Sequence, residues 1–397
     1  MPPVYLTARA LGRVAPGLVV AAAVAVGACG AGMPPPSLVP SAPSAQVIGT
    51  LLLVGDAGVP ALDDPVLAAV AAAVAEAPTR VTVVFLGDNI YPTGLPAEDA
   101  PSRDTAEARL RAQLEAARGA ASIVFVPGNH DWTRGADDGW DAIRRQAAFV
   151  AGSGVPNARV LPEQGCPGPT EVAPSPLRVT VLDTQWWLHD GPKPRDPSSA
   201  CDADSPGEVT AQLRRWLRTD STTPAVVLGH HPIRTGGVHG GYFTWKDHLF
   251  PLTALKSWLW IPLPIIGSGY PLARSLGISK QDMSSGRYQE MRDSLAAAFR
   301  ARPPLVYAAG HEHNLQILDG DSLGVHTLVV SGSGAFQHTS PIARLRETRY
   351  ASAASGFVRL DALRDGRVRL AVIEVGDDRR AREAHSEWLV SSSAAAP

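Results

Sequence analysis

The chain has 397 residues, of which 45% are hydrophobic and 19% are charged, and its formal net charge is −2. This composition is ordinary for a globular protein with room for one large domain or two. It contains neither the basic excess that favours nucleic-acid binding nor a run of like charges that would mark an interaction tail.

The first 28 residues have the pattern of an export signal. Arg9 and Arg13 precede an apolar stretch that is too short to cross a bilayer and that ends in small residues. The string VGAC, ending at Cys29, resembles the box of bacterial lipoproteins, in which the cysteine is lipidated and becomes the mature N-terminus. An ordinary signal peptide with an incidental cysteine is the alternative. Because Gly30 rather than Asp follows Cys29, we expect a bacterial outer-membrane or periplasmic lipoprotein, attached to the membrane by its lipid.

The rest of the chain divides by composition. Residues 29–46 are rich in Pro, Ser and Ala and read as a tether, and a single folded domain is expected at 47–376, with an apolar insertion at about 240–285. Residues 377–397 form a polar tail that we expect to be loose. Cys166 and Cys201 lie in Pro/Gly/Ser-rich stretches of an exported chain and predict one disulfide, with two free thiols as the alternative.

Within the domain, strand and helix patterns alternate. Apolar β-branched runs predict strands, and amphipathic runs with capping residues predict helices. The expected elements are strand 48–54, helix 65–76, strand 82–86, helix 104–118, strand 123–126, helix 138–150, strand 177–184, helix 206–218, strand 225–228, helix 287–300 and strands 305–309 and 325–331. The stretch 152–177 reads as irregular, and a hairpin is expected about Asp365 and Gly366. The order predicts an α/β sandwich with mixed sheets.

Five of these strands end in residues that bind metals. Because open α/β sheets build their sites outside the carboxyl ends of the strands, we expect these side chains to meet. They are Asp56, Asp88, Asn129, His130, His230, His311 and His313. A carboxylate, amide and imidazole set of this size predicts a hydrolase with two metal ions, with Asp88 between them.

The strings that carry these residues are GDAG, GDNIY, GNHD, GHHP and GHEHNLQIL. In this order they resemble the five motifs of the calcineurin-like metallophosphoesterases, over roughly residues 48–335. GDN followed by one residue and Tyr91, together with the later SGSG, is most similar to the purple acid phosphatases of the tartrate-resistant type. Two features depart from that pattern: Ala57 stands where these enzymes usually have Trp, and the apolar insertion is additional.

The resemblance implies a fold and a set of roles. The fold would be a four-layer αββα sandwich with two mixed sheets. The implied ligands are Asp56, Tyr91 and His313 for a first metal, Asn129, His230 and His311 for a second, and Asp88 bridging both. The implied metals are Fe(III) and a divalent ion, which is Fe, Zn or Mn. His130 would stabilise the transition state or protonate the leaving group, and His239 would contact substrate.

The expected function is therefore hydrolysis of phosphate monoesters of a small-molecule substrate, by attack of a metal-bound hydroxide. A phosphodiesterase that acts on nucleotides or lipid head groups with the same site is one alternative. A non-catalytic surface binding lipoprotein is another, but no ligand position is missing from the sequence.

Several further residues have two interpretations. His231 is expected to be structural or to support a ligand, and Glu312 to face away from the metals. Trp132, Arg134, Trp186 and Trp187 either line the pocket rim or are packed in the core. The apolar stretch 249–271, interrupted by prolines, is either a buried satellite core, or a lid or surface for a membrane or an apolar substrate.

Overall fold

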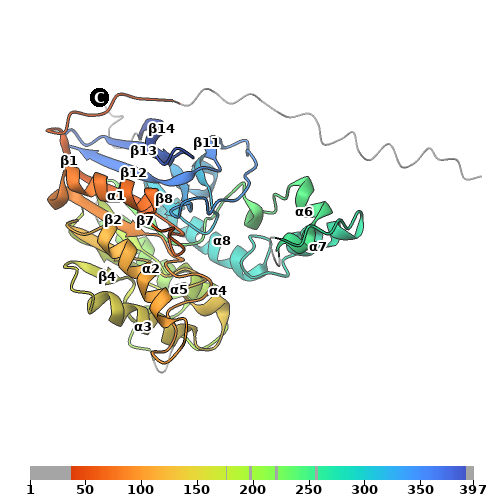
Figure 1. Ribbon diagram of the computed structural model, residues 1–397. Helices are drawn as coiled ribbons and strands as arrows, with labels where there is room; N and C mark the ends of the chain where they lie inside the picture. The colour runs from red at the N-terminus through yellow and green to blue at the C-terminus, as the bar shows by residue number, and fades with distance from the viewer. Residues whose placement is uncertain (1–36, 176, 196–198, 220–221, 255–257, 390–397) are drawn as a thin grey trace, which may run out of the picture. The chain divides into compact units, whose positions relative to one another are not determined.

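The structure is a computed structural model, and it describes residues 37–389 apart from 176, 196–198, 220–221 and 255–257 (Figure 1). The predicted export signal and Cys29 lie outside the described residues. Within the described part of the chain, no helix is both long and apolar enough to cross a membrane.

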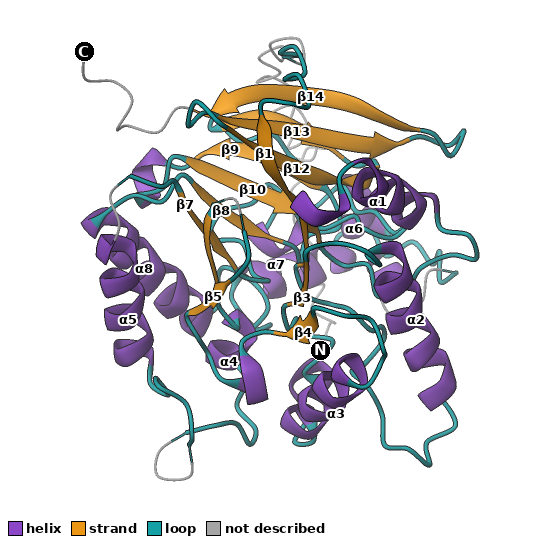
Figure 2. Ribbon diagram, turned by 90° about the vertical axis from the view of Figure 1, so that its left-hand side faces the viewer, coloured by secondary structure: helices purple, strands orange, loops and turns teal. Residues whose placement is uncertain are grey.

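Two seven-stranded mixed sheets form the centre of the domain (Figure 2). The first has the order β14-β13-β12-β1-β2-β3-β4, with β1 at Val47–Val54, β2 at Val81–Phe85, β3 at Ser122–Phe125, β4 at Ala158–Val160, β12 at Ser355–Leu363, β13 at Val368–Val375 and β14 at Ala381–Leu389. The second has the order β11-β9-β10-β8-β7-β6-β5, with β5 at Thr170–Val172, β6 at Arg178–Val181, β7 at Ala225–Leu228, β8 at Val306–Ala309, β9 at Leu315–Asp319, β10 at Thr327–Ser331 and β11 at Thr348–Ser352.

Helices cover the outer face of each sheet (Figure 2). On the first sheet these are α1 at Pro65–Glu76, α2 at Arg103–Ala116 and α3 at Gly139–Ala151. On the second they are α4 at Thr184–Leu188, α5 at Pro206–Thr219 and α8 at Gly286–Ala301. An apolar core lies between each sheet and its helices. A third apolar core lies between the two sheets and contains side chains from both, for example Leu51 and Val84 from the first sheet and Val226 and Val306 from the second. The predicted four-layer αββα sandwich is therefore confirmed.

Local chemistry explains why the elements begin where they do. Asp64 caps α1, because its carboxylate accepts hydrogen bonds from the amides of Val66 and Leu67, and Pro65 at the first helical position needs no such partner. Strands β1, β2 and β3 run parallel in one sheet, as do β6, β7 and β8 in the other. Within each sheet, the carboxyl ends of these three strands therefore lie at the same end of the sheet.

The C-terminal region differs from its prediction. Residues Ala381–Leu389 are not loose but form β14, which pairs antiparallel with β13. Part of the predicted tether is also held here, since the Ser386 amide donates to the carbonyl of Ser37 and its hydroxyl accepts from the amide of Val39. The strand escaped prediction because it is an edge strand of largely polar residues. The stretch expected to be irregular likewise contains β4 and β5, each only three residues long.

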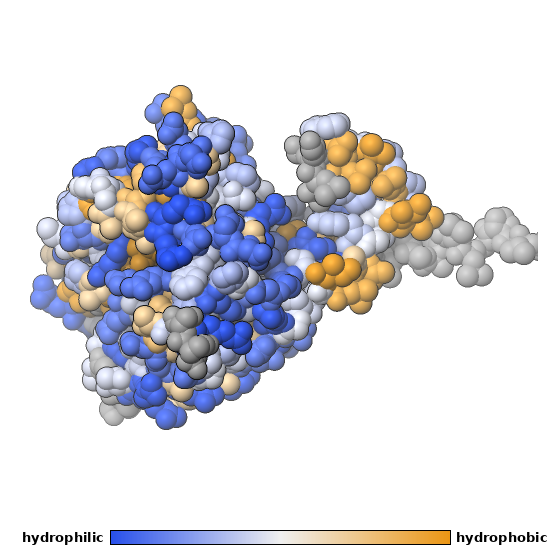
Figure 3. Space-filling view, turned by 90° about the horizontal axis from the view of Figure 1, so that it is seen from below, coloured by the Kyte–Doolittle hydropathy of each residue, from blue (hydrophilic) through white to orange (hydrophobic). Residues whose placement is uncertain are grey.

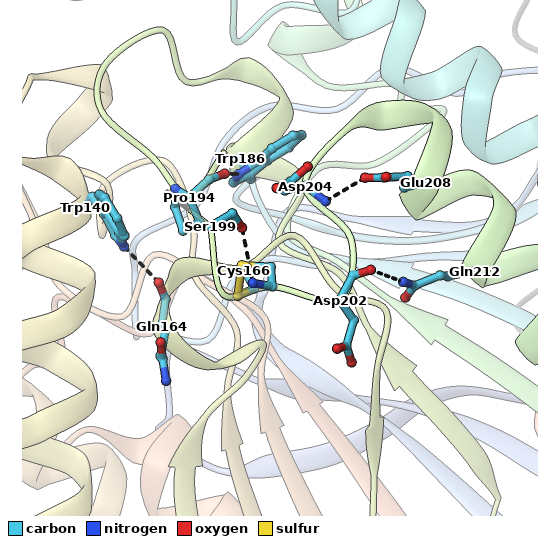
Figure 4. The surroundings of a disulfide bond; sticks show 11 residues. Trp140, Gln164, Cys166, Trp186, Pro194, Ser199, Asp202, Asp204, Glu208 and Gln212 are labelled. Atoms are coloured by element: carbon cyan, nitrogen blue, oxygen red, sulfur yellow. Dashed lines mark hydrogen bonds between the residues drawn. A yellow bond between two sulfur atoms is a disulfide. The ribbon is translucent and has the colours of Figure 1, made fainter. Parts of the chain in front are cut away.

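The hairpin about Asp365 and Gly366 is present as β12 and β13. The disulfide between Cys166 and Cys201 is also present, and it joins the loop before β5 to the loop before α5 (Figure 4). Beside it, the first turn of α5 is fixed by Glu208, whose carboxylate accepts from the amide of Asp204. The disulfide therefore fixes the approach of the chain to α5.

The apolar insertion contains α6 at Trp245–Leu249 and α7 at Gly269–Ser275, which lie apart from the sheets in Figure 1. We call residues 242–278 the arm. The expectation of a buried satellite core is wrong, because ten large apolar side chains of the arm are exposed, while others such as Phe243 and Phe250 are only half-buried. These exposed side chains, which we call the arm patch, are Tyr242, Trp245, Trp258, Trp260, Ile261, Ile265, Ile266, Leu272, Leu276 and Ile278. Helices of five and seven residues, separated by Pro262 and Pro264, are too short to enclose a core of their own.

Candidate metal centre

The strand ends bring the predicted ligands together as expected. Asp56 follows β1, Asp88 follows β2, Asn129 follows β3, His230 follows β7, and His311 and His313 follow β8. Three of them, Asp56, Asp88 and His311, have positive φ angles of 59°, 54° and 70°. Such backbone is costly for residues with a side chain and is typical of functional sites.

The first cluster of donors surrounds the phenol of Tyr91. Its oxygen lies 2.9 Å from Asp56 Oδ1, 3.0 Å from Asp88 Oδ2 and 2.9 Å from His313 Nε2. Asp56 Oδ1 and His313 Nε2 are 3.5 Å apart. All four donor atoms thus converge on one small volume.

The second cluster surrounds the amide oxygen of Asn129. This oxygen lies 3.0 Å from His230 Nε2 and 3.0 Å from His311 Nδ1. Asp88 Oδ1 lies 3.4 Å from His230 Nε2. Asp88 therefore turns one carboxylate oxygen to each cluster, which is the arrangement of a bridging ligand.

Hydrogen bonds to carbonyl groups fix the tautomers of two histidines. His230 Nδ1 lies 2.8 Å from the Leu86 carbonyl oxygen, and His311 Nε2 lies 3.1 Å from that of Gln281. Because a carbonyl can only accept, these nitrogens carry the protons. The lone pairs of His230 Nε2 and His311 Nδ1 are left facing the cluster, as in metal-binding histidines whose second nitrogen is tied to a carbonyl.

The charges at this site are unbalanced. Burial raises the pKa of Asp56 well above its ordinary value, and the charge of Asp88 adds to this effect against the opposing influence of His230. Burial also disfavours the charged form of Asp88, but His230 and His130 outweigh it and lower its pKa to about 2. Burial raises the pKa of Tyr91 far above its usual range, and both carboxylates raise it further. The raised pKa values of Asp56 and Tyr91 mean that their anionic forms lack compensating positive charge, which bound cations would supply.

Asp131 holds two of the ligand loops together. Its Oδ1 accepts from the amides of Asn89 and Ile90 at 3.0 and 3.1 Å. Its Oδ2 accepts from the amide of Gly128 at 2.8 Å and from Asn89 Nδ2 at 3.0 Å. Asn89 follows Asp88 in the chain and Gly128 precedes Asn129, so this carboxylate fixes the spacing of the bridging candidate and the amide ligand candidate.

A cavity of about 680 Å³ opens above the two clusters. His130 and His239 both line it. His130 Nδ1 donates to the Pro92 carbonyl at 2.7 Å, which leaves Nε2 on the cavity side, 3.9 Å from Asp88 Oδ2. His239 Nδ1 donates to Asp282 Oδ1 at 2.9 Å, which leaves Nε2 free of this bond.

The arm and the segment after it form one wall of this cavity. Arg274, Ile278, Ser279, Lys280 and Gln281 line it from that side. Asp282 joins the two parts of the wall, since it is paired with Arg274 as well as with His239. The insertion therefore adjoins the site, as the lid alternative requires; of the arm patch, Ile278 lines the cavity, whereas the three tryptophans do not.

The structure decides between the two interpretations that the sequence left open for several residues. Arg134 lines the cavity, whereas Trp132, Trp186 and Trp187 are buried in the core between the second sheet and its helices. His231 is buried and hydrogen-bonds Thr184 and Gln281, in agreement with a supporting role. Glu312 is buried and accepts from the His239 amide at 2.9 Å, so it faces away from both clusters.

Sequence reasoning missed four participants: Asp131, Gln281, Asp282 and His338. The ring of His338 lies 4.1 Å from that of His313 and 5.0 Å from that of Tyr91, and burial lowers its pKa to about 4. Asp131 could have been found, since it belongs to the GNHD string. The others lie in segments without a recognisable pattern.

The fold and the site together define a metal-dependent phosphoesterase, with buried His and Asp clusters consistent with a binuclear centre. Residues 49–315 match the model of the calcineurin-like phosphoesterases, and the chain belongs to this family.

Two solved structures are similar to the chain in fold. A purple acid phosphatase, PPD1, from yellow lupin (Lupinus luteus) seeds has a TM-score of 0.50 and 12% identity, over 88% of this chain and 56% of the lupin chain. GAP50, the anchor in the inner membrane complex of Plasmodium, has a TM-score of 0.47 and 14% identity, over 85% of this chain and 89% of that chain. No curated protein matches the chain.

Proposed function

We propose that the protein is an exported acid phosphatase of the purple type, which hydrolyses phosphate monoesters at a centre of Fe(III) and a divalent ion. The observation that carries the proposal is the position of Asp88, whose two oxygens face separate donor clusters, only one of which contains a tyrosine.

The donor chemistry fits this pair of metals. Asp56, Tyr91 and His313 would hold the first ion together with Asp88, and carboxylate and phenolate oxygens are hard donors that suit a trivalent ion. Asn129, His230 and His311 would hold the second, and imidazole and amide suit Fe(II), Zn or Mn. Two cations at such a site supply the positive charge that binds phosphate and lowers the pKa of water.

The side chains around the cavity have complementary roles. His130 would stabilise the transition state or give a proton to the leaving alkoxide from Nε2, the nitrogen that the bond to Pro92 leaves on the cavity side. His239 would bind a phosphate oxygen with Nε2 while Asp282 holds its ring. Arg134, at the same cavity, would add a cation for the substrate.

The cellular location forms part of this proposal. The N-terminal pattern supports export and lipidation at Cys29, and the disulfide between Cys166 and Cys201 accords with an oxidising compartment. Mass spectrometry of the mature N-terminus tests lipidation. A chain that begins at residue 1 without modification would contradict it.

The central experiment is a metal analysis and an absorption spectrum of the iron-supplied protein, compared with Tyr91→Phe. We expect about two metals per chain and a broad visible band from tyrosinate and Fe(III) that Tyr91→Phe abolishes. Tyr242→Phe, at an exposed tyrosine of the arm, is the matched control and should keep the band. Two metals without a visible band would exclude a phosphatase of the purple type. No bound metal at all would exclude a metal-dependent enzyme.

A second candidate is a phosphodiesterase with the same site. It is favoured by the wall that the arm region adds to the cavity, with Arg274, Lys280 and the apolar Ile278 within reach of a second ester group. Rates on p-nitrophenyl phosphate and bis(p-nitrophenyl) phosphate separate the two. A higher kcat/KM on the diester would replace the monoesterase proposal.

A further inference from the structure

The arm patch contains most of the exposed large apolar side chains among the described residues. Of 13 exposed large apolar side chains among the described residues, ten belong to this patch. In Figure 3 the hydrophobic residues gather on the arm, while the face of the main body seen there is largely hydrophilic. Clusters of this kind mark surfaces that contact another molecule or a membrane.

We propose that the arm patch is a membrane-docking surface that inserts into the interface of a lipid bilayer containing anionic lipids. The composition of the patch is the first argument. Three of its side chains, Trp245, Trp258 and Trp260, are tryptophans, the residue most typical of the membrane interface, and aliphatic side chains accompany them.

Charge is the second argument. Residues 240–285 contain four Lys or Arg against two acidic residues, a net charge of +2, whereas the whole chain carries −2. Among the charged side chains that the structure describes there, Asp282 is paired with Arg274 and His239, and Lys280 is paired with Asp190, while Asp247 accepts from the Thr244 amide at 2.6 Å and Lys246 is exposed. The sequence of the insertion therefore carries a positive balance, which favours an anionic surface.

The backbone at the tip is the third argument. Ile265 has φ 71° and ψ −60°, in a three-residue turn closed by the bond from the Ile266 amide to the Pro264 carbonyl at 2.9 Å. A β-branched residue in this conformation is strained. In this strained turn the side chain of Ile265 is 91% exposed to solvent. Strained backbone of this kind is typical of functional positions, which favours a binding role for the exposed isoleucine.

The fourth argument is continuity with the chain ends and the site. If Cys29 is lipidated, as proposed above, at most about 30 Å of extended chain separates the lipid from Ser37, which is fixed to β14. The lipid would then keep the domain close to the bilayer, so that a surface with modest affinity meets the membrane at a high effective concentration. In α7, moreover, Arg274 lines the catalytic cavity while Leu272 is exposed, so docking would bring the cavity to the bilayer surface.

The test uses vesicles and reads binding, so it does not depend on metals or on catalysis. Residues 37–397 contain both sheets and their cores, and this chain lacks the lipid anchor. Its flotation is measured with phosphatidylcholine vesicles with and without phosphatidylglycerol. We expect binding that increases with the anionic lipid.

The triple variant Trp258→Ser, Trp260→Ser, Ile265→Ser should lower the partition coefficient by at least about tenfold. Leu62→Ser is the matched control, since Leu62 is 92% exposed outside the arm, and it should bind as the parent does. Ile266→Asp tests the patch with a single exposed change, and circular dichroism confirms that each variant is folded.

Three outcomes would overturn the proposal. The parent chain could fail to bind either vesicle, or the triple variant and Ile266→Asp could bind as the parent does. Sedimentation velocity could also show a dimer that Ile266→Asp dissociates, with no vesicle binding, in which case a second copy of the chain covers the patch.

Discussion

Replacing Asp131 by Asn tests whether one buried carboxylate fixes the distance between the two donor clusters. The asparagine oxygen can keep the bonds from the amides of Asn89 and Ile90. Its NH₂ group, however, would face the Gly128 amide and Asn89 Nδ2, which are both donors. Two hydrogen bonds are therefore lost while the shape of the side chain is kept.

The size of the effect follows from these contacts. Each bond to a charged acceptor contributes roughly 1.5–3 kcal/mol. Part of this is offset, because burial raises the pKa of Asp131 well above its ordinary value and the variant no longer buries a charge. We expect a net loss of about 2–4 kcal/mol in the free energy of unfolding, a large share of the roughly 5–15 kcal/mol of a typical domain.

The assay is urea unfolding of the EDTA-treated protein, followed by metal analysis of the refolded protein. Asp131→Asn should also weaken metal binding by about 10–100-fold, as is usual for residues that support a ligand. Asp141→Asn, at an exposed side chain of α3, is the matched control and should change neither quantity. If Asp131→Asn unfolds and binds metal like the parent chain, the carboxylate does not set the spacing of the loops.

Three further predictions concern the surrounding structure. Burial raises the pKa of Asp183 from 3.8 to about 7, so the ionisation of this side chain lowers the stability of the metal-free fold as pH rises from about 4 to 7, and urea unfolding should show that Asp183→Asn gains roughly 4 kcal/mol relative to the parent over this range; an equal change in both chains would refute this. Gly128→Ala would place a Cβ 2.3 Å from Asp88 Oδ1, so metal analysis should show loss of metal, whereas Gly207→Ala, with nothing within 4 Å, should retain it. The double variant Cys166→Ala, Cys201→Ala opens a loop with a sequence separation of 35, and thermal unfolding should show a loss of about 4 kcal/mol in the chain-entropy model, where less than about 1 kcal/mol would contradict that account.

The donor clusters could be predicted because their signal is local. An apolar run followed by Gly and a polar residue specifies both a buried strand and the loop at its end, so Asp56 or His230 can be placed without knowing the whole fold. Because β1 pairs in parallel with β2, and β7 with β8, the loops that follow these strands lie at the same end of each sheet.

The supporting residues could not be placed in the same way. Gln281 and Asp282 act on His311 and His239, residues about 30 and 40 positions away, and only the folded chain brings them together. The sequence around them has no metal-binding pattern, and an acidic residue in a loop usually has no such role. Strand β14 was missed for a related reason, because its pairing with β13 supplies an order that its own polar sequence does not indicate.

The arm reverses the usual inference from an apolar run. Such a run predicts burial when neighbouring elements can cover it, and among the described residues no helix or strand covers the arm patch. The prolines divide the segment itself into short helices and turns, which cannot enclose a core. The same short elements place Arg274 and Gln281 at the cavity while the tryptophans remain outside. One insertion thus serves the metal site from one side and presents an apolar surface on the other. For this reason, a substrate or membrane that engaged the arm patch would act directly on the wall that positions His239.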